Sequence, residues 1–104
     1  LYFSQSWNFG PNDKNLKSVH WIINQIEKYW KNPHWIVEDN NKFTETNILK
    51  LDISKSNSLL GWNPKWDLNK TLDLTVSWYK SWLSDQDVFN SCLLQINEYF
   101  GKKI

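Results

Sequence analysis

The sequence contains no methionine, one cysteine and only three glycines among its 104 residues. A single thiol, Cys92, excludes an internal disulfide framework and is typical of a reducing cytoplasm. No Cys/His cluster has the spacing of a zinc site, and no apolar run approaches the roughly 18 residues that a membrane span requires. We therefore expect a cytoplasmic protein with no metal site and no membrane segment.

Strong charge of either sign is also lacking, because the formal net charge is +1. Binding to nucleic acid or to an anionic membrane would call for a basic stripe or patch. Neither partner is therefore expected.

The three glycines, Gly10, Gly61 and Gly101, lie far apart, so the chain has no glycine-rich turn for a dinucleotide phosphate. A Tyr-x-x-x-Lys pattern occurs at Tyr99 to Lys103, but no strand or glycine loop precedes it, and we interpret it as coincidence. No other catalytic motif is present. The sequence thus predicts no catalytic residue and no bound cofactor within this chain.

Aromatic residues are abundant, with eight Trp, five Phe and four Tyr. Each large ring buries on the order of 150–250 Å², so rings are expected to supply much of the core. The length predicts a single domain over residues 1–104. Because the chain begins at Leu1 and not at Met, we expect it to be a piece of a longer protein.

Helix signals recur along the chain. Ser18 is a candidate N-cap for a helix that ends near Pro33, and Asp67 is a candidate N-cap for a helix from Leu68 to Leu83. A short helix is expected from Ile53, capped by Asp52 and stopped by Gly61. Ser84 and Asp85 predict a break and a new N-cap. A last helix follows with one buried stripe, on which Cys92 is an inert core thiol; the stripe comprises Val88, Phe89, Cys92, Leu93, Ile96 and Tyr99 or Phe100.

Strand signals are shorter. The apolar and aromatic runs Trp7–Phe9, His34–Glu38 and Ile48–Leu51 each favour a short strand. Together with the helix signals they predict an α+β fold of about four helices with two or three strands.

Three motifs in the second half of the chain share their order with a known family. They are D-x-S-K at Asp52 to Lys55, L-G-W-x-P at Leu60 to Pro64, and T-x-x-W-Y at Thr75 to Tyr79. In this order they resemble the C-terminal part of the extended short-chain dehydrogenase/reductases that act on nucleotide-sugars, the NAD-dependent epimerase/dehydratase family. S-W-N-F-G-P-N-D (Ser6–Asp13) and W-I-I (Trp21–Ile23) narrow the resemblance to CDP-sugar 4,6-dehydratases.

The resemblance implies a role for the chain. It would be the C-terminal, substrate-binding portion of a lyase of deoxysugar and polysaccharide biosynthesis, and inactive by itself. Its partners would be a CDP-sugar and a separate N-terminal Rossmann domain that holds NAD. Removal from that domain is expected to expose an apolar face near Trp7 or Phe9, through which the chain could self-associate.

The resemblance also implies substrate-binding residues. Counting back from Asp52 without gaps places Lys42 and Glu45 where relatives carry residues that contact the nucleotide. Lys42 would neutralise a diphosphate as a point charge, although the family has Arg there, and Glu45 would accept hydrogen bonds from ribose hydroxyls. Lys17, just before the first helix, is a further phosphate candidate.

Two alternatives remain open. One is the C-terminal part of another nucleotide-sugar dehydratase or epimerase, since D-x-S-K and L-G-W-x-P are widely shared. The other is a self-standing Trp-rich module that binds a sugar or a protein. Exposed coplanar rings at Trp21, Trp35, Trp62 and Trp66 would favour the module, and packed rings the dehydratase.

Overall fold

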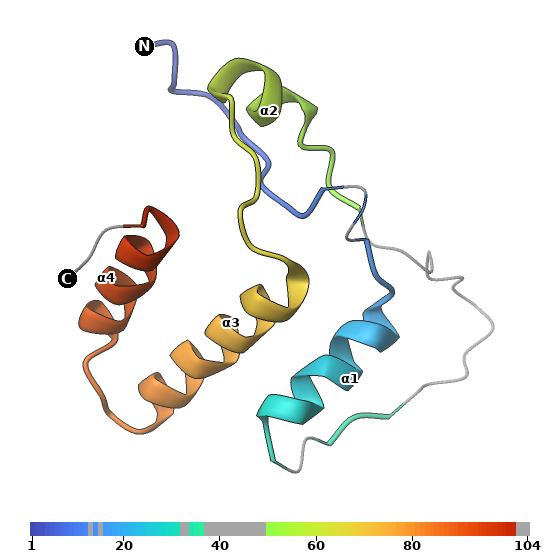
Figure 1. Cartoon of the computed structure of the whole chain (residues 1–104), viewed down its shortest axis with the longest axis vertical. Coiled ribbons are helices and arrows are strands. Elements are labelled where there is room, and N and C mark those ends of the chain that lie inside the picture. Colours follow the sequence, from blue (N-terminus) through green and yellow to red (C-terminus); the bar gives the residue numbers. More distant parts are fainter. Residues whose placement is uncertain (13, 15, 32–33, 37–49, 102–104) are drawn as a thin grey trace.

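A computed structural model describes residues 1–12, 14, 16–31, 34–36 and 50–101. Within them lie four helices, which are α1 (Val19–Tyr29), α2 (Ser54–Leu60), α3 (Leu68–Leu83) and α4 (Val88–Tyr99). Helix α3 lies between α1 and α4 and contacts both, whereas α2 stands apart beside the N-terminal segment (Figure 1). None of the described helices is long and apolar enough to cross a membrane.

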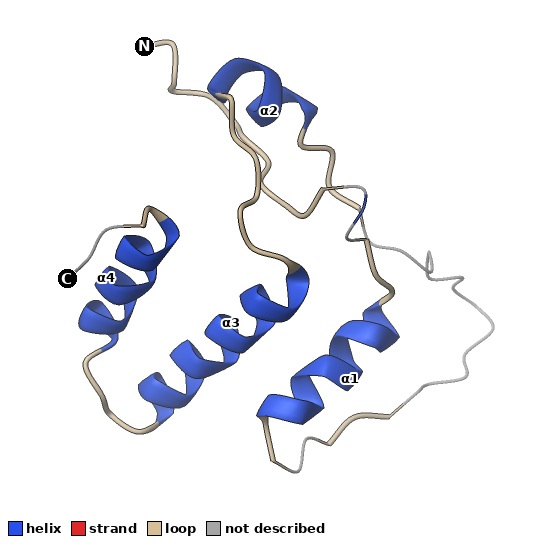
Figure 2. Ribbon diagram, in the orientation of Figure 1, coloured by secondary structure: helices blue, strands red, loops and turns tan. Residues whose placement is uncertain are grey.

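The predicted α+β class is wrong for the described residues, which contain helices and loops but no strand (Figure 2). Residues 7–9 and 34–36 are loop, and half of the third candidate, Ile48 and Leu49, lies outside the described residues. A strand needs a neighbouring strand to take up its backbone hydrogen bonds, and the described residues form none beside residues 7–9. The prediction of about four helices is confirmed.

Two helix starts follow the sequence closely. The Ser18 hydroxyl accepts a hydrogen bond from the Trp21 amide at 3.1 Å, and the Asp67 carboxylate accepts one from the Lys70 amide at 2.8 Å. Both side chains satisfy an amide that has no partner within the first turn. The prediction of α3 from Leu68 to Leu83 is confirmed, and α1 ends at Tyr29, before Pro33.

The short helix α2 begins one residue later than predicted. Ile53, not Asp52, occupies the N-cap position, but Asp52 still accepts a hydrogen bond from the Ser54 amide at 2.9 Å. At the other end Gly61 adopts φ +64°, and the amides of Gly61 and Trp62 both donate to the Ser56 carbonyl. The predicted glycine stop is thus confirmed as a left-handed C-terminal turn.

The start of α4 needs a similar correction. Asp87, not Asp85, is the N-cap, and its side chain accepts a hydrogen bond from the Asn90 amide at 3.2 Å. Asp85 has φ 54° and turns the chain out of α3. Asp tolerates this left-handed conformation better than most residues, because its short side chain can bond locally.

The helices bury little apolar surface. Among the described residues Val76 on α3, 4% exposed, is the one buried hydrophobic side chain. The radius of gyration is 16.6 Å, against about 13 Å expected for a compact domain of this length. The chain is therefore an open arrangement whose rings pack against one another only in part.

The predicted buried stripe of α4 is divided between two faces. Cys92, Gln95 and Glu98 face α3, where they contact Trp78, Leu74 and Lys70. The face made by Phe89, Leu93, Ile96 and Phe100 is open, and Cys92 is itself exposed to solvent, so the prediction of a buried core thiol is wrong. Only about a third of a turn separates the centres of the two faces, and no described element covers the second.

Candidate functional site

A polar hollow of about 480 Å³ opens between the N-terminal segment and the loop that leads into α2. Its wall is made of Asn12, Lys50, Leu51, Asp52, Ile53, Ser54, Asn57 and Asn63. Amide, carboxylate, hydroxyl and ammonium groups predominate in this list. Such a lining fits a ligand with many hydroxyl groups or a phosphate better than an apolar one.

The D-x-S-K residues and their neighbour hold the two walls together. Lys55 donates a hydrogen bond to the Ser6 carbonyl at 2.8 Å, with its ammonium 4.5 Å from the centre of the Trp7 ring. Ser56, which is completely buried, donates to the Asn8 carbonyl at 2.7 Å. This motif therefore fastens the N-terminal segment onto α2 and brings Asn12 to the hollow.

Gly10 lies where the same two segments meet. A Cβ at Gly10 would lie 3.5 Å from the Leu51 side chain and 3.6 Å from that of Ile53, which is ordinary van der Waals contact. The hollow thus forms where the N-F-G-P loop crosses the start of the D-x-S-K element.

The carboxylate of Asp52 is held in its charged form. The pKa of Asp52 lies below its usual value because the Ser54 side chain and the Ser54 amide both donate hydrogen bonds to it, with a smaller effect from the nearby Lys50 ammonium. At neutral pH the hollow therefore presents a negative acceptor at Asp52 beside a positive donor at Lys50.

Two asparagines line the hollow at α2 and just after it. The side-chain nitrogen of Asn57 donates hydrogen bonds to the Asn63 side-chain oxygen at 2.6 Å and to the Trp62 carbonyl at 3.2 Å. The amide of Asn63 is therefore turned so that its nitrogen remains a donor.

Asn12 carries the most informative group of the hollow. Its Oδ1 is buried and accepts no hydrogen bond from any described residue. A buried acceptor without a donor is costly, by roughly 1–3 kcal/mol, and Asn12 is also one of the residues that line the hollow.

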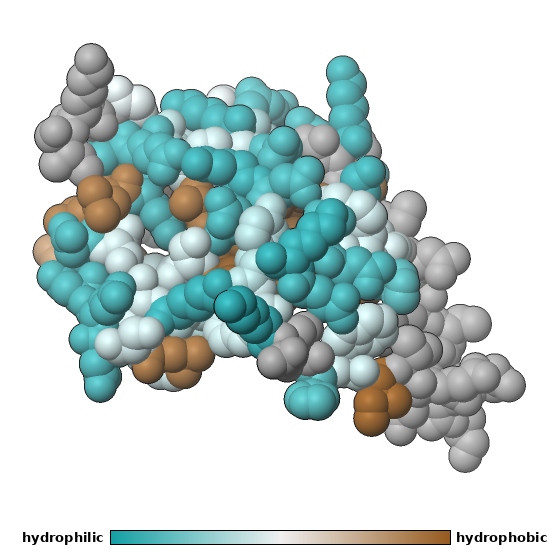
Figure 3. Space-filling view, turned by 60° about the horizontal axis from the view of Figure 1, so that its bottom comes forward, coloured by the Kyte–Doolittle hydropathy of each residue, from teal (hydrophilic) through white to brown (hydrophobic). Residues whose placement is uncertain are grey.

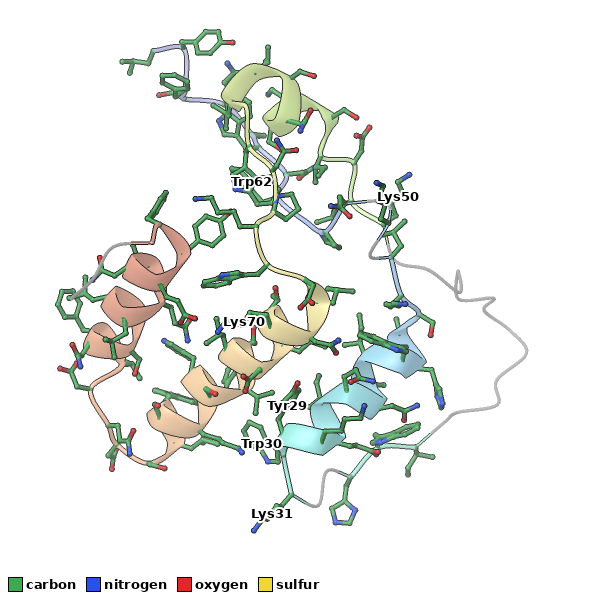
Figure 4. The ribbon with its side chains drawn as sticks, in the orientation of Figure 1. Tyr29, Trp30, Lys31, Lys50, Trp62 and Lys70 are labelled. Carbon is green, nitrogen blue, oxygen red and sulfur yellow. The ribbon has the colours of Figure 1, made fainter. Side chains whose placement is uncertain are left out.

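Lys50 was not singled out from the sequence, nor was Asn12 except as a turn former. Figure 4 shows Lys50 at the edge of the described chain, just before the α2 loop. Its position two residues before Asp52 was visible in the sequence, but only the fold brings it to the same hollow as Asn12.

A second hollow, of about 300 Å³, lies on the other side of the N-F-G-P loop and is walled by aromatic rings. Phe9 packs edge-to-face on Trp62 with ring centres 5.1 Å apart, and Trp66 packs in the same way on Tyr99 at 4.9 Å. The first pair thus joins the N-terminal loop to the segment between α2 and α3, and the second joins that segment to α4.

The four tryptophans named as discriminators are each partly buried. Trp62 and Trp66 pack as described, Trp35 packs edge-to-face on His20, and the Trp21 ring lies 5.3 Å from the Lys17 ammonium. This is the packed arrangement and not a platform of free rings.

The residues predicted to bind substrate are only partly described. Lys42 and Glu45 lie outside the described residues. Lys17 is exposed and does not line the polar hollow, and its role in phosphate binding stays a prediction. Across residues 1–12, 14, 16–31, 34–36 and 50–101, no group of three or more His, Cys, Asp and Glu side chains could hold a metal ion.

Comparison with known proteins finds a similarity to one part of a known enzyme. The chain is similar to one part of a sugar-nucleotide 4,6-dehydratase, which agrees with the resemblance seen in its motifs. The relative is the CDP-glucose 4,6-dehydratase of Salmonella typhimurium (strain LT2), to which the chain is 38% identical over 100 residues. The match covers 95% of this chain but only 28% of the relative, and no family model matches the chain.

Proposed function

We propose that the chain is the nucleotide-sugar binding portion of a CDP-glucose 4,6-dehydratase. The parent enzyme would convert CDP-glucose to CDP-4-keto-6-deoxyglucose with loss of water, in the cytoplasm, as a step toward deoxysugars for polysaccharides. The 38% identity to one part of such an enzyme supports this proposal, as does the polar lining of the hollow.

The single observation that carries the proposal is the polar hollow lined by Asn12, Lys50 and Asp52, in which Asn12 also has a buried side-chain oxygen without a hydrogen-bond donor among the described residues. A nucleotide-sugar brings hydroxyl donors for Asn12 and Asp52, and a diphosphate for Lys50. Lys42 and Glu45, and more weakly Lys17, are proposed to extend this site. The contribution of these residues would be to hold and orient the substrate, which lowers the entropic part of the barrier.

NAD, which the parent enzyme would use, does not fit the described residues. Its pyrophosphate needs a glycine turn between a strand and a helix, whereas Gly10 and Gly61 flank no such unit. We therefore propose that NAD and the acid/base pair belong to a separate Rossmann domain, and assign no hydride or proton transfer to this chain.

That domain would be the natural cover for the apolar surface around α2. Phe9, Leu51 and Leu59 are each about half exposed there, at 49%, 52% and 49%. Exposed apolar side chains that lie close together mark interaction surfaces. A Trp-rich sugar-binding module remains the weaker candidate, because the discriminating rings pack on their neighbours.

Isothermal titration of the 104-residue chain with CDP-glucose tests the proposal. We expect binding, and roughly fivefold weaker binding for Asn12→Ala, because the loss of one buried hydrogen bond costs about 1 kcal/mol. Asn90→Ala on the exposed side of α4 serves as the matched control and should bind like the unmodified chain.

Titrations with UDP-glucose and with glucose 1-phosphate separate the candidate substrates. Tighter binding of CDP-glucose than of UDP-glucose favours the CDP enzyme, and the reverse order favours a relative that uses another base. Absence of binding by all three compounds, or equal binding by Asn12→Ala, would contradict the assignment of the hollow.

A further inference from the structure

One face of α4 is an apolar seam without a described partner. It consists of Phe89, Leu93, Ile96 and Phe100, whose exposures are 71%, 42%, 52% and 61%. The intervals of four, three and four residues are those with which one helix packs its side chains into another. The adjacent face of α4 is already used, since it contacts α3 through Cys92, Gln95 and Glu98.

The charges near the seam favour another copy of the same helix. Within α4 the one charged residue is Glu98, which forms an ion pair with Lys70 at 2.5 Å on the α3 side. Two copies of the seam can therefore meet without like charges at their centre. Figure 3 shows apolar side chains open to solvent on the side of the molecule where α4 lies.

The two ends of the seam carry opposite charges. The N-terminal end has the exposed carboxylates of Asp85 and Asp87, next to Phe89. The C-terminal end has Lys65, whose ammonium lies 5.3 Å from the centre of the Phe100 ring. Antiparallel pairing of two seams would place Lys65 of one copy near Asp87 of the other, and the two helix dipoles would also oppose each other favourably.

The area of the seam is adequate for a stable pair. With about 200 Å² for a fully exposed large side chain, the four residues expose roughly 450 Å². A standard interface covers about 800 Å² on each partner, of which a little over half is apolar. The seam therefore matches the apolar share of one side of such an interface.

We propose that two copies of the chain dimerise through antiparallel pairing of their α4 seams. The two-fold axis passes between Leu93 and Ile96, so that Leu93 of one copy meets Ile96 of the other, and Phe89 meets Phe100. This interface lies on α4, apart from the surface near Trp7 and Phe9 that the sequence predicted for self-association. It does not depend on the proposed substrate.

Sedimentation velocity on the 104-residue chain at high micromolar concentration tests the pairing with two charged variants. Leu93→Lys and Ile96→Glu each place two unpaired charges in the homodimer. We expect the dissociation constant of the dimer to rise roughly a hundredfold for each variant. An equimolar mixture should recover the dimer, because the antiparallel register brings the new ammonium and the new carboxylate together and leaves Leu93 opposite Ile96.

Phe3→Glu is the control, because Phe3 is also an exposed apolar residue, at 67%, but belongs to the N-terminal segment and not to the seam. It should dimerise like the unmodified chain, and circular dichroism should show equal helicity for all variants. If the unmodified chain is a monomer, the proposal is wrong, and another part of the parent enzyme would cover the seam. Dimers unaffected by both charged variants, or variants that stay monomeric when mixed, would overturn it as well.

Discussion

At the residue scale, Ser56 ties α2 to the N-terminal segment. Its hydroxyl is completely buried and lies within hydrogen-bonding distance of the carbonyls of Asn8, at 2.7 Å, and Ile53, at 3.0 Å. Buried hydroxyls are retained where they satisfy a backbone group that water cannot reach. Ser54, in the D-x-S-K motif, and Ser56, just after it, thus serve the architecture of the site.

Replacement of Ser56 should lower the stability of the fold. Ser56→Ala removes the donor to the Asn8 carbonyl, and we expect a loss of about 1–3 kcal/mol in the free energy of unfolding. Ser58→Ala is the matched control, because Ser58 lies on the same helix but is exposed. Urea unfolding followed by circular dichroism measures both, and equal midpoints for the two variants would count against the role of Ser56.

Asp52 should make the fold acid-sensitive. Its pKa is lowered in the folded state by the hydrogen bonds from Ser54, so its contribution is present above the unfolded pKa, about 3.9, and is lost as the pH falls through the lower folded value. We expect the melting temperature to fall below about pH 4, and Asp52→Asn to reduce that fall. Asp85→Asn should leave the fall in melting temperature unchanged. If the melting temperature falls equally with pH in the two variants, Asp52 is not the cause of the acid sensitivity.

At the scale of the elements, the ends of helices are the best determined features. Gly61 adopts φ +64°, which a residue with a Cβ disfavours by about 1–2 kcal/mol, whereas Gly10 does not have a left-handed backbone. We therefore expect Gly61→Ala to lower the free energy of unfolding by about 1 kcal/mol and Gly10→Ala to change it little. Thermal melts of the two variants measure this difference. A larger loss of stability for Gly10→Ala than for Gly61→Ala would contradict it.

The sequence could predict those features of the fold that depend on a few neighbouring residues. Caps such as Ser18 and Asp67 act within one turn, so the local sequence contains all the necessary information. The strand expected at Trp7–Phe9 fails because pairing depends on a distant segment. The apolar residues of α4 were assigned to one face, although Cys92 contacts α3 and Phe89 faces solvent, because a broad stripe does not reveal how many partners share it.

The candidate site was predictable only in part. The motifs around Asp52 and the N-F-G-P loop were recognised, and both contribute to the polar hollow. Asn12 and Lys50 were missed because their common position depends on how two remote segments cross. Lys42 and Glu45 lie outside the described residues, so their place in the site stays a prediction.

At the scale of the whole molecule, the described residues expose much apolar surface of the kind that interfaces cover. Val76 is the one buried hydrophobic side chain in the described parts, while large rings on α3 and α4, such as Trp82 and Phe89, are more than half exposed. A domain that buries so little depends on association for stability. The proposed Rossmann domain near α2 and the proposed second copy at α4 would cover different parts of this surface.

The most direct test of the central claim is a nuclear magnetic resonance titration of the chain with CDP-glucose, read at the asparagine side-chain amides. The proposed site predicts concentration-dependent shifts for Asn12, Asn57 and Asn63, which line the polar hollow, and none for Asn90 on α4. Unchanged signals for the three asparagines of the hollow at saturating CDP-glucose would contradict a nucleotide-sugar site there.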